Sequence, residues 1–349
     1  MSADQNPPGP RDRGRPRRGI VRALAAAVTV LTLAACGLRA ETPAPVEPSP
    51  DAIEQVRART VADSLALAEA ATAAAQLPDG AVDPVAPVLA DVTSFSGQHA
   101  DQLGGVYVSG LPTPTGSPTT APPPATATVG EVLAQLATAA ATARADADAL
   151  TDGPLARLVA SVATSRAELA TRLAHATGTE VPPVPDATAT ATASPAPTPS
   201  GTALVDGLTA DELGALALVH DQAGYGFEVV AAKLSGDQRS TAAAAAAAHR
   251  SRSEEWAQAA GIDGSAQDPR RASYTLPAGL DDPAVATTLA RTLETAVADA
   301  YATAVAQAAP GSRAPLLDGL RDATDAAAGW GATPVPFPGL PERAQQPTG

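Results

Sequence analysis

The stretch of sequence that decides the fold is TADELGALALVHDQAGYGFEVVAAKL, residues 209–234. It opens with Thr209 and Glu212, which fit the T-x-x-E capping box of a helix N-terminus. After it, one set of residues recurs alternately three and four positions apart, namely Leu213, Leu216, His220, Ala223, Phe227, Val230 and Leu234. This spacing aligns their side chains on one face of a helix that packs in a left-handed bundle. The stretch therefore predicts an α-helix with partner helices.

Three further helices are predicted after this one, and the four together predict a four-helix bundle over residues 204–343. The further helices span about residues 235–260, 282–309 and 314–330. Ser235 and Gln238 fit a second capping box. Asp282 and Pro283 fit an N-cap followed by proline at the first helical position.

The N-terminal half shows a weaker form of the same pattern, which predicts a second helical bundle over residues 51–176. Its helices span about residues 51–77, 83–103, 129–150 and 154–176, the second opening at Asp83-Pro84 as N-cap and first helical residue. A Pro/Thr tract at residues 111–128 interrupts this bundle, and a Pro/Thr/Ala linker at 177–203 follows it. Proline blocks helix in both tracts, and large apolar residues are scarce there. The fold class is therefore all-α, with two bundles in tandem.

The composition excludes several classes of protein. Aromatic residues make up 3% of the chain, and there is one cysteine. These values disfavour a strand-rich fold, a disulfide scaffold and a thiolate metal cluster. A net charge of −14 argues against nucleic-acid binding. Neither a glycine-rich phosphate loop nor a Gly-x-Ser-x-Gly motif occurs in the sequence. We predict no cofactor and no nucleic-acid partner.

The first 36 residues have the pattern of a bacterial lipoprotein leader. Six arginines stand against two aspartates in residues 1–22, and an apolar run follows at 23–35. This run is too short to span a bilayer, so it predicts a signal peptide over residues 1–35. The cut site LAAC, residues 33–36, resembles the lipobox, whose cysteine is acylated with chains such as palmitate and becomes the mature N-terminus. We expect Cys36 to anchor the protein on the extracytoplasmic face of the cell membrane, with residues 36–50 as a Pro-rich tether. Sec and Tat export both remain open.

Residues 204–343 resemble a ferritin-like domain family of actinobacterial proteins whose function is unknown. The resemblance rests on four stretches, which are ALVHDQAGYGFEVV at 217–230, AHRSR at 248–252, ARTLE at 290–294 with Ala300-Tyr301, and PVPFPGLPE at 334–342. The last stretch is the most specific, because alanine-rich helices resemble one another easily. The resemblance implies a four-helix bundle. It implies no activity, because none is established for that family.

The metal ligands of ferritins are not repeated here. A di-iron centre needs Glu-x-x-His pairs, and Ser96, Arg172, Ala217 and Ala246 stand three residues before the four histidines. The polar residues near the helical seam are His220, Tyr225, Glu228, His249, Arg252, Glu294 and Tyr301. Two hypotheses remain for them. One is a degenerate metal or small-ligand site using Glu228, His249 and Glu294, and the other is a polar core network joining the helices, in which His220, Tyr225, Arg252 and Tyr301 take part.

The sequence favours a non-enzymatic protein. We expect a lipid-anchored envelope protein with a structural or interaction role, which touches the membrane through its anchor and has a protein partner in the cell envelope. The alternative is a metal-binding or redox enzyme with a degenerate ferritin-like site. Fold alone does not decide between these functions.

Overall fold

The computed structural model of the chain describes residues 49–108, 126–184 and 205–343. The predicted signal peptide, Cys36 and the tether up to residue 48 lie outside the described residues. So do residues 111–125 of the first Pro/Thr tract and residues 185–203 of the linker. Residues 49–349 form one compact unit.

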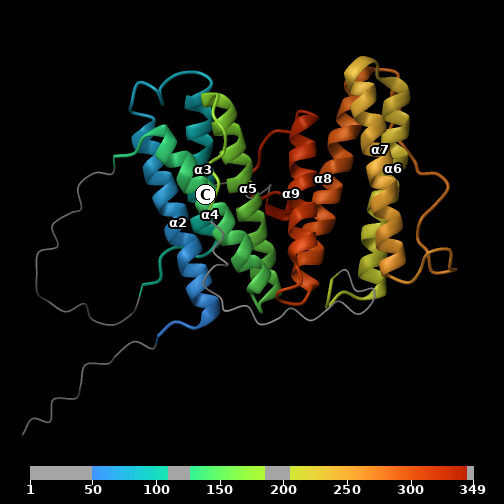
Figure 1. The fold of residues 1–349 in the computed structure, drawn as a ribbon, viewed down its shortest axis with the longest axis horizontal. Coiled ribbons are helices and arrows are strands. Elements are labelled where there is room, and N and C mark those ends of the chain that lie inside the picture. The colour runs from blue at the N-terminus through green and yellow to red at the C-terminus, as the bar shows by residue number, and fades with distance from the viewer. Residues whose placement is uncertain (1–48, 109–125, 185–204, 344–349) are drawn as a thin grey trace, which may run out of the picture. The chain divides into compact units, whose positions relative to one another are not determined.

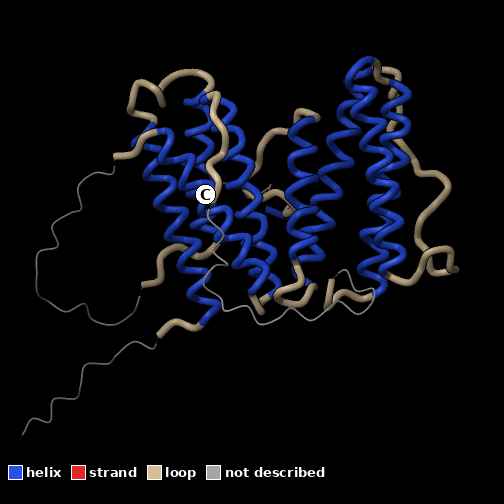
Figure 2. Tube along the Cα trace, viewed as in Figure 1, coloured by secondary structure: helices blue, strands red, loops and turns tan. Residues whose placement is uncertain are grey.

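The described residues are helical, as the sequence predicts, and contain no strand (Figures 1 and 2). The helices of the N-terminal half are α2 (Ala52–Ala74), α3 (Val85–Gln102), α4 (Val129–Ala149) and α5 (Gly153–Thr177). Those of the C-terminal half are α6 (Ala210–Lys233), α7 (Gly236–Ala259), α8 (Pro283–Gln307) and α9 (Ala314–Gly329). A short 3-10 helix, η2 (Pro341–Arg343), follows them. No helix in the described ranges is both long and apolar enough to cross a membrane.

Side chains cap most of the helix N-termini. The capping box of Thr209 and Glu212 is formed at α6, and Asp282 caps α8 through the N–H of Ala284. At α7 the predicted capping box is wrong, because the side chain of Ser235 accepts no hydrogen bond. The backbone φ there is −138°, against −77° at Thr209.

The predicted cap of α3 is also wrong. The helix begins at Val85, with Pro84 as its N-cap after a cis peptide bond. The N–H groups of Val85 and Ala86 donate to the carbonyl of Val82 at 2.8 and 2.9 Å. A tight turn therefore satisfies these donors, and the carboxylate of Asp83 is not needed.

Each half packs as a helical bundle. In the N-terminal half α2 lies against α3 and α4, and α5 lies against the same two helices. In the C-terminal half α6 packs on α7 and α8, and α8 packs on α9 (Figure 1). Helix α5 also packs on α8 and α9. One cluster of buried apolar side chains runs through this contact, so the two halves share part of their core.

The C-terminal segment at residues 334–342, here called the tail, binds to the N-terminal half. The Nε2–H of His99 on α3 donates to the carbonyl of Pro336 at 2.6 Å. On α5, Ser161 Oγ donates to the carbonyl of Pro338 at 2.7 Å. Phe337 is 5% exposed, and its ring meets the His99 ring edge-on at 5.2 Å. The tail therefore connects the last residues of the fold to α3 and α5.

A buried arginine makes a second connection between the halves. Arg313 precedes α9 and is 1% exposed. Its guanidinium donates to the carbonyls of Ala147 at 2.9 Å and Leu150 at 2.6 Å, at the end of α4. It also donates to the carbonyl of Val305 on α8 at 2.9 Å. One side chain thus joins the C-termini of two helices, where partial negative charge stabilises a cation.

Candidate functional site

Four buried side chains from three helices form a run of hydrogen bonds in the C-terminal half. His220 on α6 has Nδ1 2.9 Å from Nδ1 of His249 on α7, and Nε2 2.8 Å from Oη of Tyr301 on α8. Nε2 of His249 lies 3.2 Å from Oε1 of Glu294, also on α8. None of the four residues is more than 8% exposed. We call them the polar chain.

Hydrogen-bonding chemistry constrains the donors and acceptors of the polar chain. Trp256 Nε1–H donates to Tyr301 Oη at 3.3 Å, and the same oxygen lies 2.8 Å from Nε2 of His220. One of the two Nδ1 atoms of His220 and His249 donates to the other, and Nε2–H of His249 donates to Glu294. The run of hydrogen bonds ends on the carboxylate of Glu294.

Burial keeps two members of the polar chain uncharged. Desolvation, together with the neighbouring His249 and Arg252, lowers the pKa of His220 to about 3. Desolvation also raises the pKa of Tyr301 above its ordinary value, although the hydrogen bond from Trp256 acts in the opposite direction. The imidazole and the phenol thus stay neutral near pH 7.

Tight packing holds the polar chain in place. The ring of Phe227 stacks on His249 with the planes 11° apart and the centroids at 5.4 Å. A methyl group at Gly319 on α9 would come within 2.3 Å of the Tyr301 ring. A glycine is therefore required at this turn of α9 for the tyrosine to reach His220.

Three residues predicted to lie at the helical core lie elsewhere, and the prediction is wrong for them. Glu228 is exposed and pairs with Arg250 at 3.0 Å. Tyr225 is half-buried and packs edge-on against a loop tyrosine. Arg252 is exposed and pairs with a glutamate one turn along α7. Successive side chains of an α-helix are about 100° apart around its axis. Glu228 therefore points away from the face that Phe227 occupies.

The polar chain does not have the geometry of a metal site. One ring nitrogen of His249 faces His220 and the opposite one faces Glu294, so no single ion could bind all three. Glu228, the third member of the predicted metal set, is not at this core. Within the described part of the chain, no group of three His, Cys, Asp or Glu side chains is placed to hold a metal ion.

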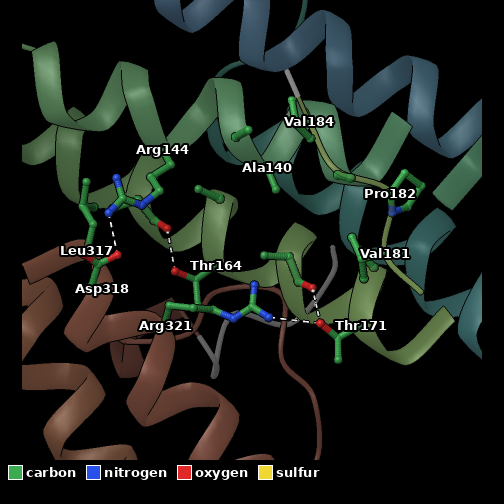
Figure 3. A pocket seen from close by; sticks show the side chains of 16 residues that line it. Ala140, Arg144, Thr164, Thr171, Val181, Pro182, Val184, Leu317, Asp318 and Arg321 are labelled. Atoms are coloured by element: carbon green, nitrogen blue, oxygen red, sulfur yellow. Dashed lines mark hydrogen bonds and ion pairs between the residues drawn. The ribbon is translucent and has the colours of Figure 1, made fainter. Parts of the chain in front are cut away.

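A pocket of about 350 Å³ lies between α4, α5 and α9, beside residues 181–184 (Figure 3). Its walls are largely alanine methyl groups. The arginines at its rim are already paired, Arg144 with Asp318 at 2.5 Å and Arg321 with Thr171 at 3.0 Å. This pocket is therefore concave but has few unpaired polar groups with which to bind a ligand.

The sequence reasoning missed a buried polar layer in the N-terminal half. Its members are Thr60 and Ser64 on α2, Ser96 and His99 on α3, and Ser165 and Arg166 on α5. The layer lies between two clusters of buried apolar side chains. A signal was present, since the apolar stripe of α5 is interrupted by Ser165-Arg166 between Val162 and Leu169.

Arg166 is the centre of this layer and is fully buried. It donates to the carbonyl of Thr60 at 2.9 Å, to Ser64 Oγ at 2.8 Å and to the carbonyl of Ala139 at 3.2 Å. Burial lowers its pKa to about 10, although Asp63 raises it. Burial also lowers the pKa of His99 to about 3. Arg166 thus ties α2 and α4 to α5, which is a structural role.

Comparison with known proteins identifies part of the C-terminal half. Residues 214–342 match a family described as a domain of unknown function (DUF4439). This range includes the polar chain and the tail. No curated protein and no solved structure matches the chain.

Proposed function

We propose that this protein is a lipid-anchored protein of the cell envelope whose helical body has a structural or interaction role and is not an enzyme. The observation that carries the proposal is the polar chain. Both nitrogens of each of its histidines already have a protein partner. A catalytic base or a metal ligand needs a free position, and these imidazoles have none. The polar chain acts instead as a buried network that joins α6, α7 and α8.

The lipid anchor in this proposal rests on the sequence LAAC at residues 33–36 and the short apolar run before it. Loss of residues 1–35 removes six arginines and two aspartates, so the mature chain is more acidic than the precursor. An acidic surface is repelled by anionic lipid. The acyl chains on Cys36 would therefore supply the membrane affinity, on the extracytoplasmic face.

The proposal also includes the class of domain to which the C-terminal half belongs. The C-terminal half would be a ferritin-like domain of an actinobacterial lipoprotein, as the stretches at 217–230 and 334–342 suggest. Its bundle of α6 to α9 and the family match over residues 214–342 support this reading. A protein partner in the envelope would bind the body that the two joined halves form.

The test uses the full chain and its Cys36→Ser variant, both expressed in a bacterium that processes lipoproteins. The wild type is expected in the detergent phase after phase separation, and Cys36→Ser in the aqueous phase. Given ferrous iron, both preparations should consume oxygen no faster than buffer does. A Cys36→Ser protein that still enters the detergent phase would disprove the anchor. Iron-dependent oxygen uptake that is lost in Glu294→Ala would establish the redox alternative.

A further inference from the structure

A groove of about 520 Å³ runs between α7 and α9 and ends at the polar chain. One wall is the polyalanine run of α7, through Ala244, Ala245 and Ala248. The other is the last turn of α9, through Ala326 and Gly329. These small side chains leave open space beside the helices. A volume of this size fits a small molecule.

Glu294 places a buried negative charge in this groove. It lines the groove although it is only 3% exposed. Its Oε1 accepts from His249, and its other oxygen has no hydrogen-bond partner among the described residues. The second oxygen is therefore free to accept a hydrogen bond from a ligand in the groove. A cationic donor on that oxygen would offset part of the cost of burying the carboxylate.

The rest of the lining favours a cation as well. No lysine or arginine lines the groove, whereas Asp237 lies at its α7 end. The carbonyl end of α9 carries partial negative charge, and its last turn has no basic residue. Trp330 also lines the groove, and an indole ring attracts organic cations. The pocket near α5 differs in this respect, because Arg144 and Arg321 line it.

We propose that the groove between α7 and α9 binds a small organic ammonium ion, with the charged nitrogen on the free oxygen of Glu294 and the alkyl part against the alanines of α7. The ammonium would donate to the carboxylate and lie beside the Trp330 ring. This binding role goes beyond the structural role proposed above, and it is independent of the lipid anchor.

The proposal gives the polyalanine run a function. Ala244, Ala245 and Ala248 line the groove, whereas Ala247 is exposed in the same run and does not line it. A leucine at position 245 would fill the space for the alkyl chain. A leucine at position 247 makes the same chemical change outside the groove and is the matched control.

The experiment is calorimetric titration of the full chain with n-hexylammonium, with n-hexanol and hexanoate as neutral and anionic probes of the same length. One hexylammonium should bind per chain, at least tenfold more tightly than hexanol. Glu294→Gln keeps an acceptor for His249 and should remove that preference. Ala245→Leu should abolish binding, whereas Ala247→Leu should bind as the wild type does.

Two results would overturn the proposal. One is equal binding, or no binding, of hexylammonium and hexanol to the wild type. The other is an Ala245→Leu protein that binds hexylammonium as tightly as Ala247→Leu. If Glu294→Gln does not fold, the comparison of the charged and neutral probes on the wild type decides the role of charge.

Discussion

At the scale of single residues, Glu168 on α5 is the buried acid with the clearest effect on stability. It is 5% exposed, and burial raises its pKa to about 7, although Arg172 acts against the shift. Between the ordinary pKa of a glutamate and this value the folded state binds more protons than the unfolded state. The free energy of unfolding therefore falls as pH rises through that window.

Replacing Glu168 by glutamine should remove this dependence. We expect Glu168→Gln to gain stability over the wild type between pH 5 and pH 8, by up to about 3 kcal/mol. Urea unfolding at the two pH values measures the difference between variant and wild type. Glu69→Gln, an exposed position on α2, is the control and should show no such gain. Equal pH profiles for Glu168→Gln and the wild type would contradict the prediction.

Part of the candidate site could be predicted at this scale. His220 belongs to the predicted seam of residues 209–234, and periodicity alone placed it on the buried face. Periodicity did not exclude Glu228 or Arg252 from the core, because a side chain near the edge of an apolar stripe can be either buried or exposed. Arg166 interrupts an apolar stripe. Its burial is explained only by the carbonyls of α2 and α4 that accept its hydrogen bonds.

At the scale of helices, two N-terminal caps offer a direct comparison. Thr209 accepts from the Glu212 N–H within a full capping box, whereas Ser235 makes no side-chain cap. Thr209→Ala should lower the free energy of unfolding by about 1 kcal/mol. Ser235→Ala should change it by no more than about 0.5 kcal/mol, since no hydrogen bond is lost. Chemical denaturation of both variants tests this, and an equal loss in the two would refute it.

The helices themselves were largely predictable. The predicted helix over residues 129–150 is α4 (Val129–Ala149), and that over 154–176 is α5 (Gly153–Thr177). The N-cap Asp152 and the following Pro154 are local signals for the start of α5. The start of α3 was predicted to within one residue, but its cap was missed because the carbonyl of Val82, a tight-turn acceptor, has no residue-type signature.

At the scale of the molecule, the contacts between the halves could not be predicted. His99 and Pro336, or Ala147 and Arg313, are far apart in the sequence, and no periodicity links them. The sequence of the tail was recognisable only as a family feature. Its role in packing on α3 and α5 is visible only in the fold.

Phe337 tests how strongly the halves depend on each other. Phe337→Ala should destabilise the fold by about 3 kcal/mol, because a ring buried against His99 leaves a cavity. Hydrogen exchange should speed up in α3, far from residue 337 in the sequence. Val335→Ala, in the same tail but 37% exposed, should have little effect. Unchanged exchange in α3 of Phe337→Ala would show that the halves are independent.

The position of the tail also bears on how the protein is made. A ribosome releases α2 to α5 long before it adds residues 334–342, so His99 and Ser161 must wait for acceptors that arrive near the end of translation. A premature stop after residue 333 would leave helices α2 to α9 intact. It would nevertheless remove hydrogen-bond acceptors from the N-terminal half, which is synthesised first. Limited proteolysis should therefore cut the truncated protein faster in that half.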